Sequence, residues 1–199
     1  MSMKIDALTV GPLSTNCYIV YLEGSGQAVV IDPGANGKKI RQALDGKAVS
    51  AVLLTHGHFD HTGALREFAD APIYMHPADE IMLTDDFWSA GQMARDDAPR
   101  PPATDFVMEG TSLRLAGLDI RVLHLPGHTM GSVAYQIGDV MFTGDTLFRR
   151  GYGRTDFPGG SEMDLRRSIR RLLALDKNWI ICPGHGEMTT LDEEREYYR

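Results

Sequence analysis

Four side chains that can bind a metal ion lie within the six residues His56-Gly57-His58-Phe59-Asp60-His61, directly after the apolar run 51–54. This cluster constrains the fold more than any other feature of the chain, because neither a hydrophobic core nor a solvent-exposed surface requires four such side chains so close together. In α/β folds, side chains at the ends of buried strands assemble functional sites, and imidazole and carboxylate groups suit zinc and related divalent ions. We therefore predict a metal site at a strand end, with His56 and His58 on one ion and with Asp60 and His61 facing a neighbouring ion.

Short apolar runs alternate with turn signals and helical stretches along the rest of the chain, which is typical of α/β proteins. The expected strands lie at residues 17–22, 28–31, 51–54, 73–75, 113–115, 120–122, 133–137, 140–143 and 179–182, the last of these being the final strand. We expect helices at residues 37–44 and 161–175, the second with Ser161 as its N-cap, and a loop leading into a helix across residues 55–68. Two strand-rich halves with no linker between them predict one domain over residues 1–199, built as a two-sheet sandwich clad by helices.

Residues 84–104 interrupt this rhythm. The segment contains Phe87, Trp88, Met93 and three prolines, without a sustained period. Long irregular stretches are usually surface excursions, and some of them are lids over a site. We expect an irregular excursion here, which is either a lid, an ordered loop or a subunit contact.

Three more expected strand ends carry metal-competent side chains next to glycines, which allow close backbone approach. They are His128 in Pro126-Gly127-His128, Asp145 in Gly144-Asp145-Thr146 and His185 in Pro183-Gly184-His185. Two other histidines lack this setting: His76 precedes Pro77 at an expected helix start, and His124 lies inside an expected strand. We expect both of these to be structural.

The motifs occur in a fixed order, namely Thr-His-x-His-x-Asp-His at 55–61, Pro-Gly-His-Thr at 126–129, Gly-Asp-Thr at 144–146 and Pro-Gly-His-Gly at 183–186. Together they resemble the metallo-β-lactamase superfamily over almost the whole chain. The segments 16–18, 32–34, 144–148 and 151–154 are similar to glyoxalase II (hydroxyacylglutathione hydrolase), and 153–160 resembles its short bacterial relatives. The resemblance implies an α/β fold, the metallo-β-lactamase αβ/βα four-layer sandwich of two mixed β-sheets clad by helices. It also implies that there is no C-terminal helical domain.

The resemblance further implies a role for each site residue. His56, His58 and His128 would hold the first of two divalent ions, Asp60, His61 and His185 the second, and Asp145 would bridge them. Asp32 would orient a ligand imidazole, and the alternative is a plain turn residue before Pro33. Arg154 would contact the glutathione part of the substrate, and the alternative is a surface ion pair with Asp156 or another acid.

The implied activity is hydrolysis of a thioester of the S-2-hydroxyacylglutathione type, with Asp60 and Asp145 as catalytic carboxylates. Two ions about 3.5–4 Å apart generate hydroxide from a bridging water and polarise the carbonyl, so no Ser or Cys nucleophile is needed. Zinc is the expected metal, with iron and manganese as alternatives.

Two other activities of the same superfamily stay open. One is a persulfide dioxygenase with a single iron, whose last histidine usually sits in Ala-His-Asp-Tyr and not in Gly-His-Gly as here. The other is a lactonase. The complete ligand set disfavours a non-enzymatic binding protein, and His61 disfavours β-lactamase activity because many β-lactamases carry Arg or Cys there.

Composition limits the partners. The formal net charge of −7, without a Lys/Arg-rich stripe, disfavours nucleic acid. The N-terminus lacks the apolar run of a signal peptide, and no run approaches the roughly 18 apolar residues of a membrane span. We therefore expect a cytoplasmic protein with a small-molecule thioester substrate and no membrane partner, and the oligomeric state stays open. Cys17 and Cys182 each lie in an apolar run, where reduced, buried thiols are expected in preference to a disulfide.

Overall fold

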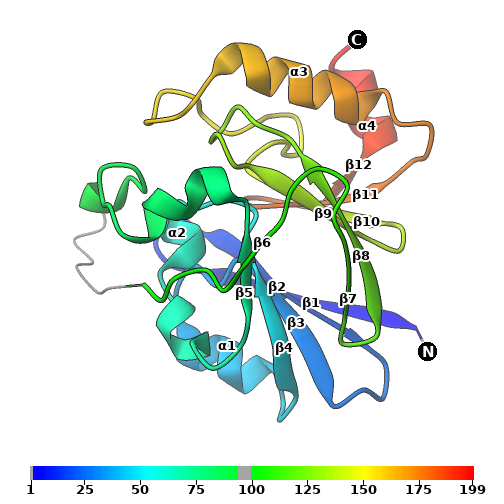
Figure 1. Ribbon diagram of the computed structural model, residues 1–199. Coiled ribbons are helices and arrows are strands. Elements are labelled where there is room, and N and C mark those ends of the chain that lie inside the picture. The colour runs from blue at the N-terminus through cyan, green and yellow to red at the C-terminus, as the bar shows by residue number, and fades with distance from the viewer. Residues whose placement is uncertain (1, 94–99) are drawn as a thin grey trace.

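The computed structural model describes residues 2–93 and 100–199, and its strands form two sheets that face each other (Figure 1). Each sheet has six strands among the described residues. In spatial order, the first contains β1 (Met3–Val10), β2 (Thr15–Leu22), β3 (Gln27–Ile31), β4 (Ala48–Leu53), β5 (Ile73–Met75) and β6 (Asp105–Phe106). The second contains β12 (Thr189–Thr190), β11 (Ile180–Pro183), β10 (Val140–Gly144), β9 (Val133–Ile137), β8 (Leu118–His124) and β7 (Ser112–Leu115).

Strand direction decides which loops meet. In the first sheet β3 and β4 are parallel. In the second, β9 is antiparallel to both β8 and β10, and β10 is parallel to β11. The carboxyl ends of β8, β10 and β11 therefore lie at one edge of their sheet, and the loops that follow them can converge.

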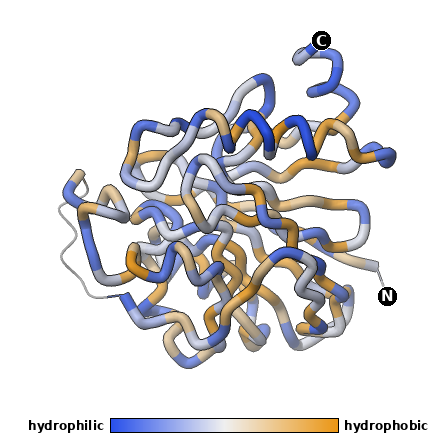
Figure 2. The backbone as a smooth tube through the Cα atoms, turned by 45° about the horizontal axis from the view of Figure 1, so that its top comes forward, coloured by the Kyte–Doolittle hydropathy of each residue, from blue (hydrophilic) through white to orange (hydrophobic). Residues whose placement is uncertain are grey.

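Helices cover the outer faces of the sandwich (Figure 1). α1 (Gly37–Ala43) and the 3-10 helix η1 (Leu65–Phe68) pack on the first sheet, and α3 (Glu162–Leu173) and α4 (Leu191–Tyr197) pack on the second. The other helices are α2 (Phe59–Thr62) and the 3-10 helices η2 (Pro77–Leu83) and η3 (Gly91–Met93). Ile40 and Phe68 pack on the outer side of the first sheet, Val29 and Tyr135 fill the space between the sheets, and Leu165 joins α3 to the second sheet. Hydrophobic residues accordingly run along the central strands, while the C-terminal end is hydrophilic (Figure 2). The expected four-layer αβ/βα sandwich is confirmed.

Most expected elements are present. The hairpin predicted around Gly117 joins β7 to β8, and the Gly138-Asp139 turn joins β9 to β10. Ser161 is the N-cap of α3, where its hydroxyl accepts a hydrogen bond from the Asp164 N–H at 3.3 Å. The loop and helix expected over 55–68 is a tight turn followed by the short helices α2 and η1.

Four strands and α-helices were not predicted. β1 precedes the first expected strand and β6 follows the irregular segment 84–104. β12 and α4 follow residues 179–182, so the prediction that this run is the final strand is wrong. α4 has the polar sequence Leu-Asp-Glu-Glu-Arg-Glu-Tyr, in which only Leu191 and Glu194 are buried, so it lacks a clear apolar stripe. The two residues of β12 become a strand only through pairing with β11.

Residues 84–104 lie only partly within the described residues. Their described part contains η3 and no other helix or strand, and it leads into β6. Residues 94–99 lie outside the described residues, so a lid over the site stays a prediction. Cys17 and Cys182 are both free and buried, as predicted. Among the described residues, none of the helices is long and apolar enough to cross a lipid bilayer.

Candidate metal centre

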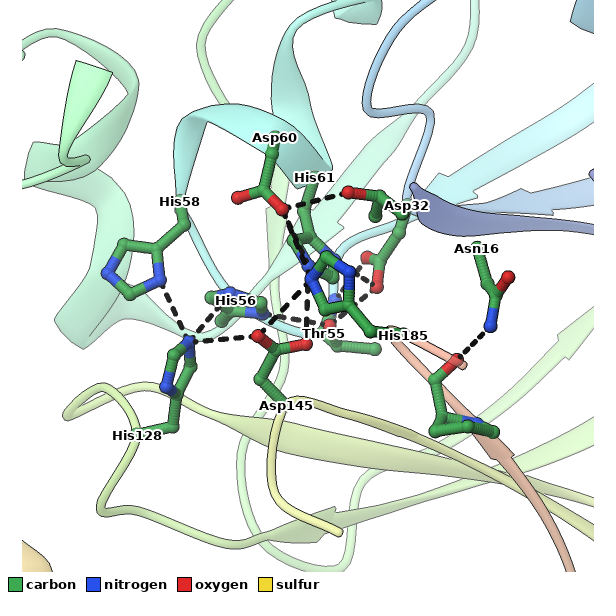
Figure 3. Close-up of polar contacts among 12 residues, drawn as sticks. Asn16, Asp32, Thr55, His56, His58, Asp60, His61, His128, Asp145 and His185 are labelled. Carbon is green, nitrogen blue, oxygen red and sulfur yellow. Dashed lines mark hydrogen bonds and ion pairs between the residues drawn. The ribbon is translucent and has the colours of Figure 1, made fainter. Parts of the chain in front are cut away.

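The predicted ligands meet at one edge of the sandwich because each of them follows a strand of one of the two sheets. His56 and His58 follow β4, and the chain then turns into α2, which carries Asp60 and His61. The second sheet contributes its ligands from the loops after β8, β10 and β11, namely His128, Asp145 and His185. The structure brings all seven predicted ligands together (Figure 3).

The first donor set consists of three buried histidines, His56, His58 and His128. Nδ1 of His58 lies 2.9 Å from Nε2 of His128, which lies 3.2 Å from Nε2 of His56. Three ring nitrogens from two sheets therefore converge on one point.

The second donor set consists of Asp60, His61 and His185. Oδ2 of Asp60 lies 3.2 Å from Nε2 of His185 and 3.6 Å from Nε2 of His61. The Thr15 hydroxyl donates a hydrogen bond to the same carboxylate oxygen at 2.8 Å, and this contact fixes the orientation of Asp60.

Asp145 contacts both donor sets, and Figure 3 shows it between His128 and His185. Its Oδ2 lies 3.5 Å from Nε2 of each of these histidines, and its Oδ1 lies 3.3 Å from Nε2 of His61. A side chain at Gly184 would remove this arrangement, because its Cβ would lie 2.2 Å from Oδ1 of Asp145.

The spacing of these atoms fits metal coordination. Ligand nitrogens at about 2.0–2.1 Å from a tetrahedral ion are about 3.3 Å apart from each other, close to the separations found here. Within the described residues, Nε2 of His61 and Oδ1 of Asp145 are buried and make no hydrogen bond. Buried polar atoms normally have partners, so these two are accounted for if they are metal ligands.

The protonation states of the first donor set favour metal binding, whereas at the second set the carboxylates of Asp60 and Asp145 outweigh burial and raise the pKa of His61 well above its usual value. Burial lowers the pKa of the His58 imidazole to about 3 and, with the neighbouring histidines, that of His56 well below its usual value. Burial alone would raise the pKa of the Asp145 carboxyl, but His61 and His128 outweigh it and hold that pKa at about 2. Neutral imidazoles and ionised carboxylates are the forms that bind divalent ions.

Hydrogen bonds orient the outer ring nitrogens. Nδ1 of His61 lies 2.9 Å from Oδ2 of Asp32, so the orienting role predicted for Asp32 has the geometry that it requires. Nδ1 of His56 lies 3.1 Å from the Thr55 hydroxyl oxygen. Backbone carbonyls hold two other rings, since Nδ1 of His128 lies 2.7 Å from the Arg154 oxygen and Nδ1 of His185 lies 3.1 Å from the Leu13 oxygen.

Asp79 is a buried residue of the site that sequence reasoning missed. Its carboxylate accepts hydrogen bonds from the Gly57 N–H at 3.1 Å, the Thr129 hydroxyl at 2.6 Å and the Gly131 N–H at 2.7 Å. Gly57 lies between two ligands of the first donor set, and Thr129 follows the third, so one carboxylate fixes both loops. A Cβ at Gly131 would lie 2.7 Å from Oδ1 of Asp79, which requires glycine there. No motif marks Asp79, and its partners are distant in sequence.

Asn16 was identified only as part of a motif, and the structure gives it a function in the loop of His185. Its side-chain amide donates hydrogen bonds to the Pro183 oxygen at 3.1 Å and to the Gly186 oxygen at 2.9 Å. The Tyr18 hydroxyl also donates to the Pro183 oxygen, at 2.7 Å. The β1–β2 side of the first sheet thus holds a ligand loop of the second sheet.

Arg154 borders the metal centre, but its positive charge is paired with the carboxylate of Asp156. Its guanidinium donates two hydrogen bonds to Asp156, at 2.6 and 2.5 Å, and lies 4.0 Å from the centre of the Phe157 ring. The hydrogen bonds from Arg154 lower the pKa of the Asp156 carboxyl to about 2. The surface ion pair considered for Arg154 is therefore present, although the residue still lines the cavity over the ligands.

His76 and His124 lie outside the donor sets, consistent with the structural role expected for them. Their rings stack with centroids 4.2 Å apart and planes 10° apart. His76 caps η2, because its Nδ1 accepts a hydrogen bond from the Ala78 N–H at 3.2 Å, and Nε2 of His124 lies 2.9 Å from the Met130 oxygen.

Comparison with known proteins identifies the family. The model of the Metallo-beta-lactamase superfamily matches residues 10–185 of the chain. The chain belongs to this superfamily. The crystal structure of the BLEG-1 B3 metallo-beta-lactamase is 33% identical with a TM-score of 0.91, and 97% of each chain is covered. The structure of TTHA1623 in a di-iron-bound form is 38% identical with a TM-score of 0.84, covering 95% of this chain and 96% of that one.

Among superfamily members of the same size, hydroxyacylglutathione hydrolase GloC of Haemophilus influenzae is 35% identical, covering 97% of this chain and 95% of that protein. The metallo-β-lactamase family and fold predicted from the motifs are confirmed. The chain is a metal-dependent hydrolase of this superfamily with a His-rich metal site.

Proposed function

We propose that the protein is a dinuclear metal-dependent hydrolase that cleaves thioesters of the S-2-hydroxyacylglutathione type. The observation that carries this proposal is the pair of complete donor sets joined by Asp145. A mononuclear oxygenase needs one set of three ligands, and the second set would have no purpose in it.

The proposed ligands follow the two sets. His56, His58 and His128 hold one ion, Asp60, His61 and His185 hold the other, and Asp145 contributes to both. Zinc suits these nitrogen and oxygen donors. Iron and manganese are the alternatives, and the di-iron form of TTHA1623 supports iron.

Water is the proposed nucleophile. Two divalent ions held here acidify water and polarise a carbonyl group. The cavity over the ligands has a volume of about 250 Å³, and the described residues that line it include no Ser, Thr or Cys. Asp60 borders this cavity, and its carboxylate, fixed by Thr15, is placed to accept a hydrogen bond from the attacking water.

Arg154 is the proposed contact for an anionic thiol carrier such as glutathione. It lines the cavity on the side of His128, whose Nδ1 bonds to the Arg154 carbonyl. To bind substrate, its guanidinium exchanges the Asp156 carboxylate for a carboxylate of the carrier. The similarity to hydroxyacylglutathione hydrolase GloC supports glutathione as the thiol carrier of the substrate.

Metal analysis combined with turnover of S-lactoylglutathione tests this function. The wild-type protein should bind two ions per chain and hydrolyse the thioester. Replacing His58 or His185 by Ala should remove one ion each, and Asp145→Asn should weaken both, with turnover lost in all three. His124→Asn is the matched control and should keep both ions. Two ions bound without thioester turnover, but with rapid lactone hydrolysis, would contradict the proposed substrate.

A further inference from the structure

A second cavity continues from the metal centre along the first sheet. It has a volume of about 410 Å³ and lies between the β1–β2 loop and α2. Leu13, Phe59, Asp60 and Met93 line both this groove and the cavity over the ligands. A molecule bound at the ligands can therefore extend directly into the groove, whose size lies within the range of small-molecule pockets, about 300–1,000 Å³.

The lining of the groove is apolar and carries no positive charge among the described residues. Beyond the shared residues it consists of Gly11, Pro12, Thr15, Gly34, Ala35 and Gly63. Within residues 2–93 and 100–199, Asp60 is the only ionisable residue in this lining. An anionic group would thus meet a carboxylate there, whereas a hydrocarbon chain would meet methyl and methylene groups and lose its contact with water.

The groove and Arg154 lie on opposite sides of the ligand cluster. Leu13 adjoins His185 through its carbonyl oxygen, and Arg154 adjoins His128 in the same way. Asp145 lies between these two histidines (Figure 3). A thioester whose carbonyl lies at the ligands extends in two directions, with the anionic thiol carrier on one side and the acyl group on the other. The site differs in the same way, because Arg154 offers a positive charge on one side and the groove is apolar on the other.

We propose that the groove binds the acyl chain of the substrate, so that among 2-hydroxyacyl thioesters the enzyme prefers those with an apolar chain longer than that of the lactoyl group. This inference rests on the proposed function, since it assumes a thioester with its carrier on the side of Arg154. It adds a specificity that neither the ligand set nor Arg154 determines.

The test uses glutathione thioesters of unbranched 2-hydroxyacyl groups from lactoyl to 2-hydroxyoctanoyl with the metal-loaded protein. Each buried methylene contributes about 0.8 kcal/mol, so kcat/KM should rise about fourfold for every CH₂ until the groove is full. In parallel, calorimetry with the free carboxylates from acetate to octanoate measures occupation of the groove without turnover. Their affinities should rise in the same proportion.

Two variants should flatten this dependence. Ala35→Phe fills the groove at a half-buried position away from the ligands, and Leu13→Asp adds a charge at its exposed border. Ala174→Phe adds the same ring at the exposed C-terminal end of α3 and should keep the wild-type dependence. Leu13→Asp keeps the test decisive if Ala35→Phe fails to fold.

The outcomes separate the groove from the proposed function. Thioester turnover that does not depend on chain length, with equally flat carboxylate binding, overturns the groove and leaves the hydrolase proposal standing. Carboxylate binding that rises with chain length, without thioester turnover, supports the groove and contradicts the proposed function. Flat binding without turnover overturns both.

Discussion

Asp32 and His61 form a buried pair in which Oδ2 of the carboxylate lies 2.9 Å from Nδ1 of the imidazole. Thr55 fixes the carboxylate further, because its backbone N–H donates to Oδ1 at 2.8 Å and its hydroxyl donates to Oδ2 at 2.6 Å. The contact with Asp32 orients the ring so that Nε2 faces the carboxylates of Asp60 and Asp145. Asp32 is therefore placed to orient the imidazole of His61.

Asp32→Asn should lower the affinity for the ion held by His61 by about ten- to a hundredfold, because partners of ligand imidazoles typically contribute that much. Asparagine is the appropriate replacement, since residue 32 has a φ of 51° and Asn tolerates this region. Competition with a chromophoric chelator measures the change. Asp139→Asn, in the exposed turn between β9 and β10, is the control. An unchanged affinity in Asp32→Asn would mean that the pair serves folding alone.

The sequence could indicate the side chains that the structure brings together because their identity is local. Each ligand follows an apolar strand and stands beside a glycine or another ligand, and such motifs are visible in a few residues. Asp79 could not be found in this way, because its role depends on Gly57 and Gly131, which only the sandwich brings to it. β12 could not be predicted either, because its two residues form a strand only by pairing with β11. α4 could not be predicted because its charged sequence has no apolar stripe, although the helix buries Leu191.

Asp79→Leu should destabilise the protein and disturb the first donor set at the same time. The change leaves the buried N–H groups of Gly57 and Gly131 without their acceptor, at about 1–3 kcal/mol each, whereas the Thr129 hydroxyl keeps Ser132 Oγ at 2.7 Å as a partner. Chemical denaturation should therefore show a loss of about 3 kcal/mol or more, and the ion held by His56, His58 and His128 should bind more weakly.

Asp79→Asn separates these two effects. Its amide oxygen can still accept from one loop, but its NH₂ group cannot accept from the other. We expect a stable protein with weakened metal binding at the first donor set. If the metal affinity of a folded Asp79→Asn protein equals that of the wild type, Asp79 does not position the ligands.

Arg154 and Asp156 should have opposite effects on an anionic thioester. Arg154→Ala removes the proposed charge-assisted contact and should raise KM about ten- to a hundredfold, with two ions still bound. Asp156→Asn frees the guanidinium from its present partner and should lower KM. Steady-state kinetics at low ionic strength, with a neutral lactone as second substrate, measures both. Arg114→Ala, from an exposed pair with Asp119, is the control. Equal losses on both substrates would show that Arg154 only supports its loop.

The stacked pair His76 and His124 predicts an acid-sensitive stability. Burial, together with the neighbouring His124 ring, lowers the pKa of His76 to about 4, whereas an unfolded histidine titrates at about 6.5. Between these two values the unfolded chain binds a proton that the folded chain does not, so stability falls as the pH falls from about 6.5 toward 4.

His76→Asn removes this titration and keeps a side chain that can cap η2. Denaturation of the metal-free protein at pH 7 and pH 4.5 measures the effect, because loss of bound metal at low pH then cannot contribute to the change in stability. The His76 ring is partly exposed, which reduces its contribution through solvent screening, so the wild type should lose about 1 kcal/mol more than the variant over this interval. Parallel losses in the two proteins would place the acid sensitivity elsewhere, since His76 is the only titrating group that differs between them.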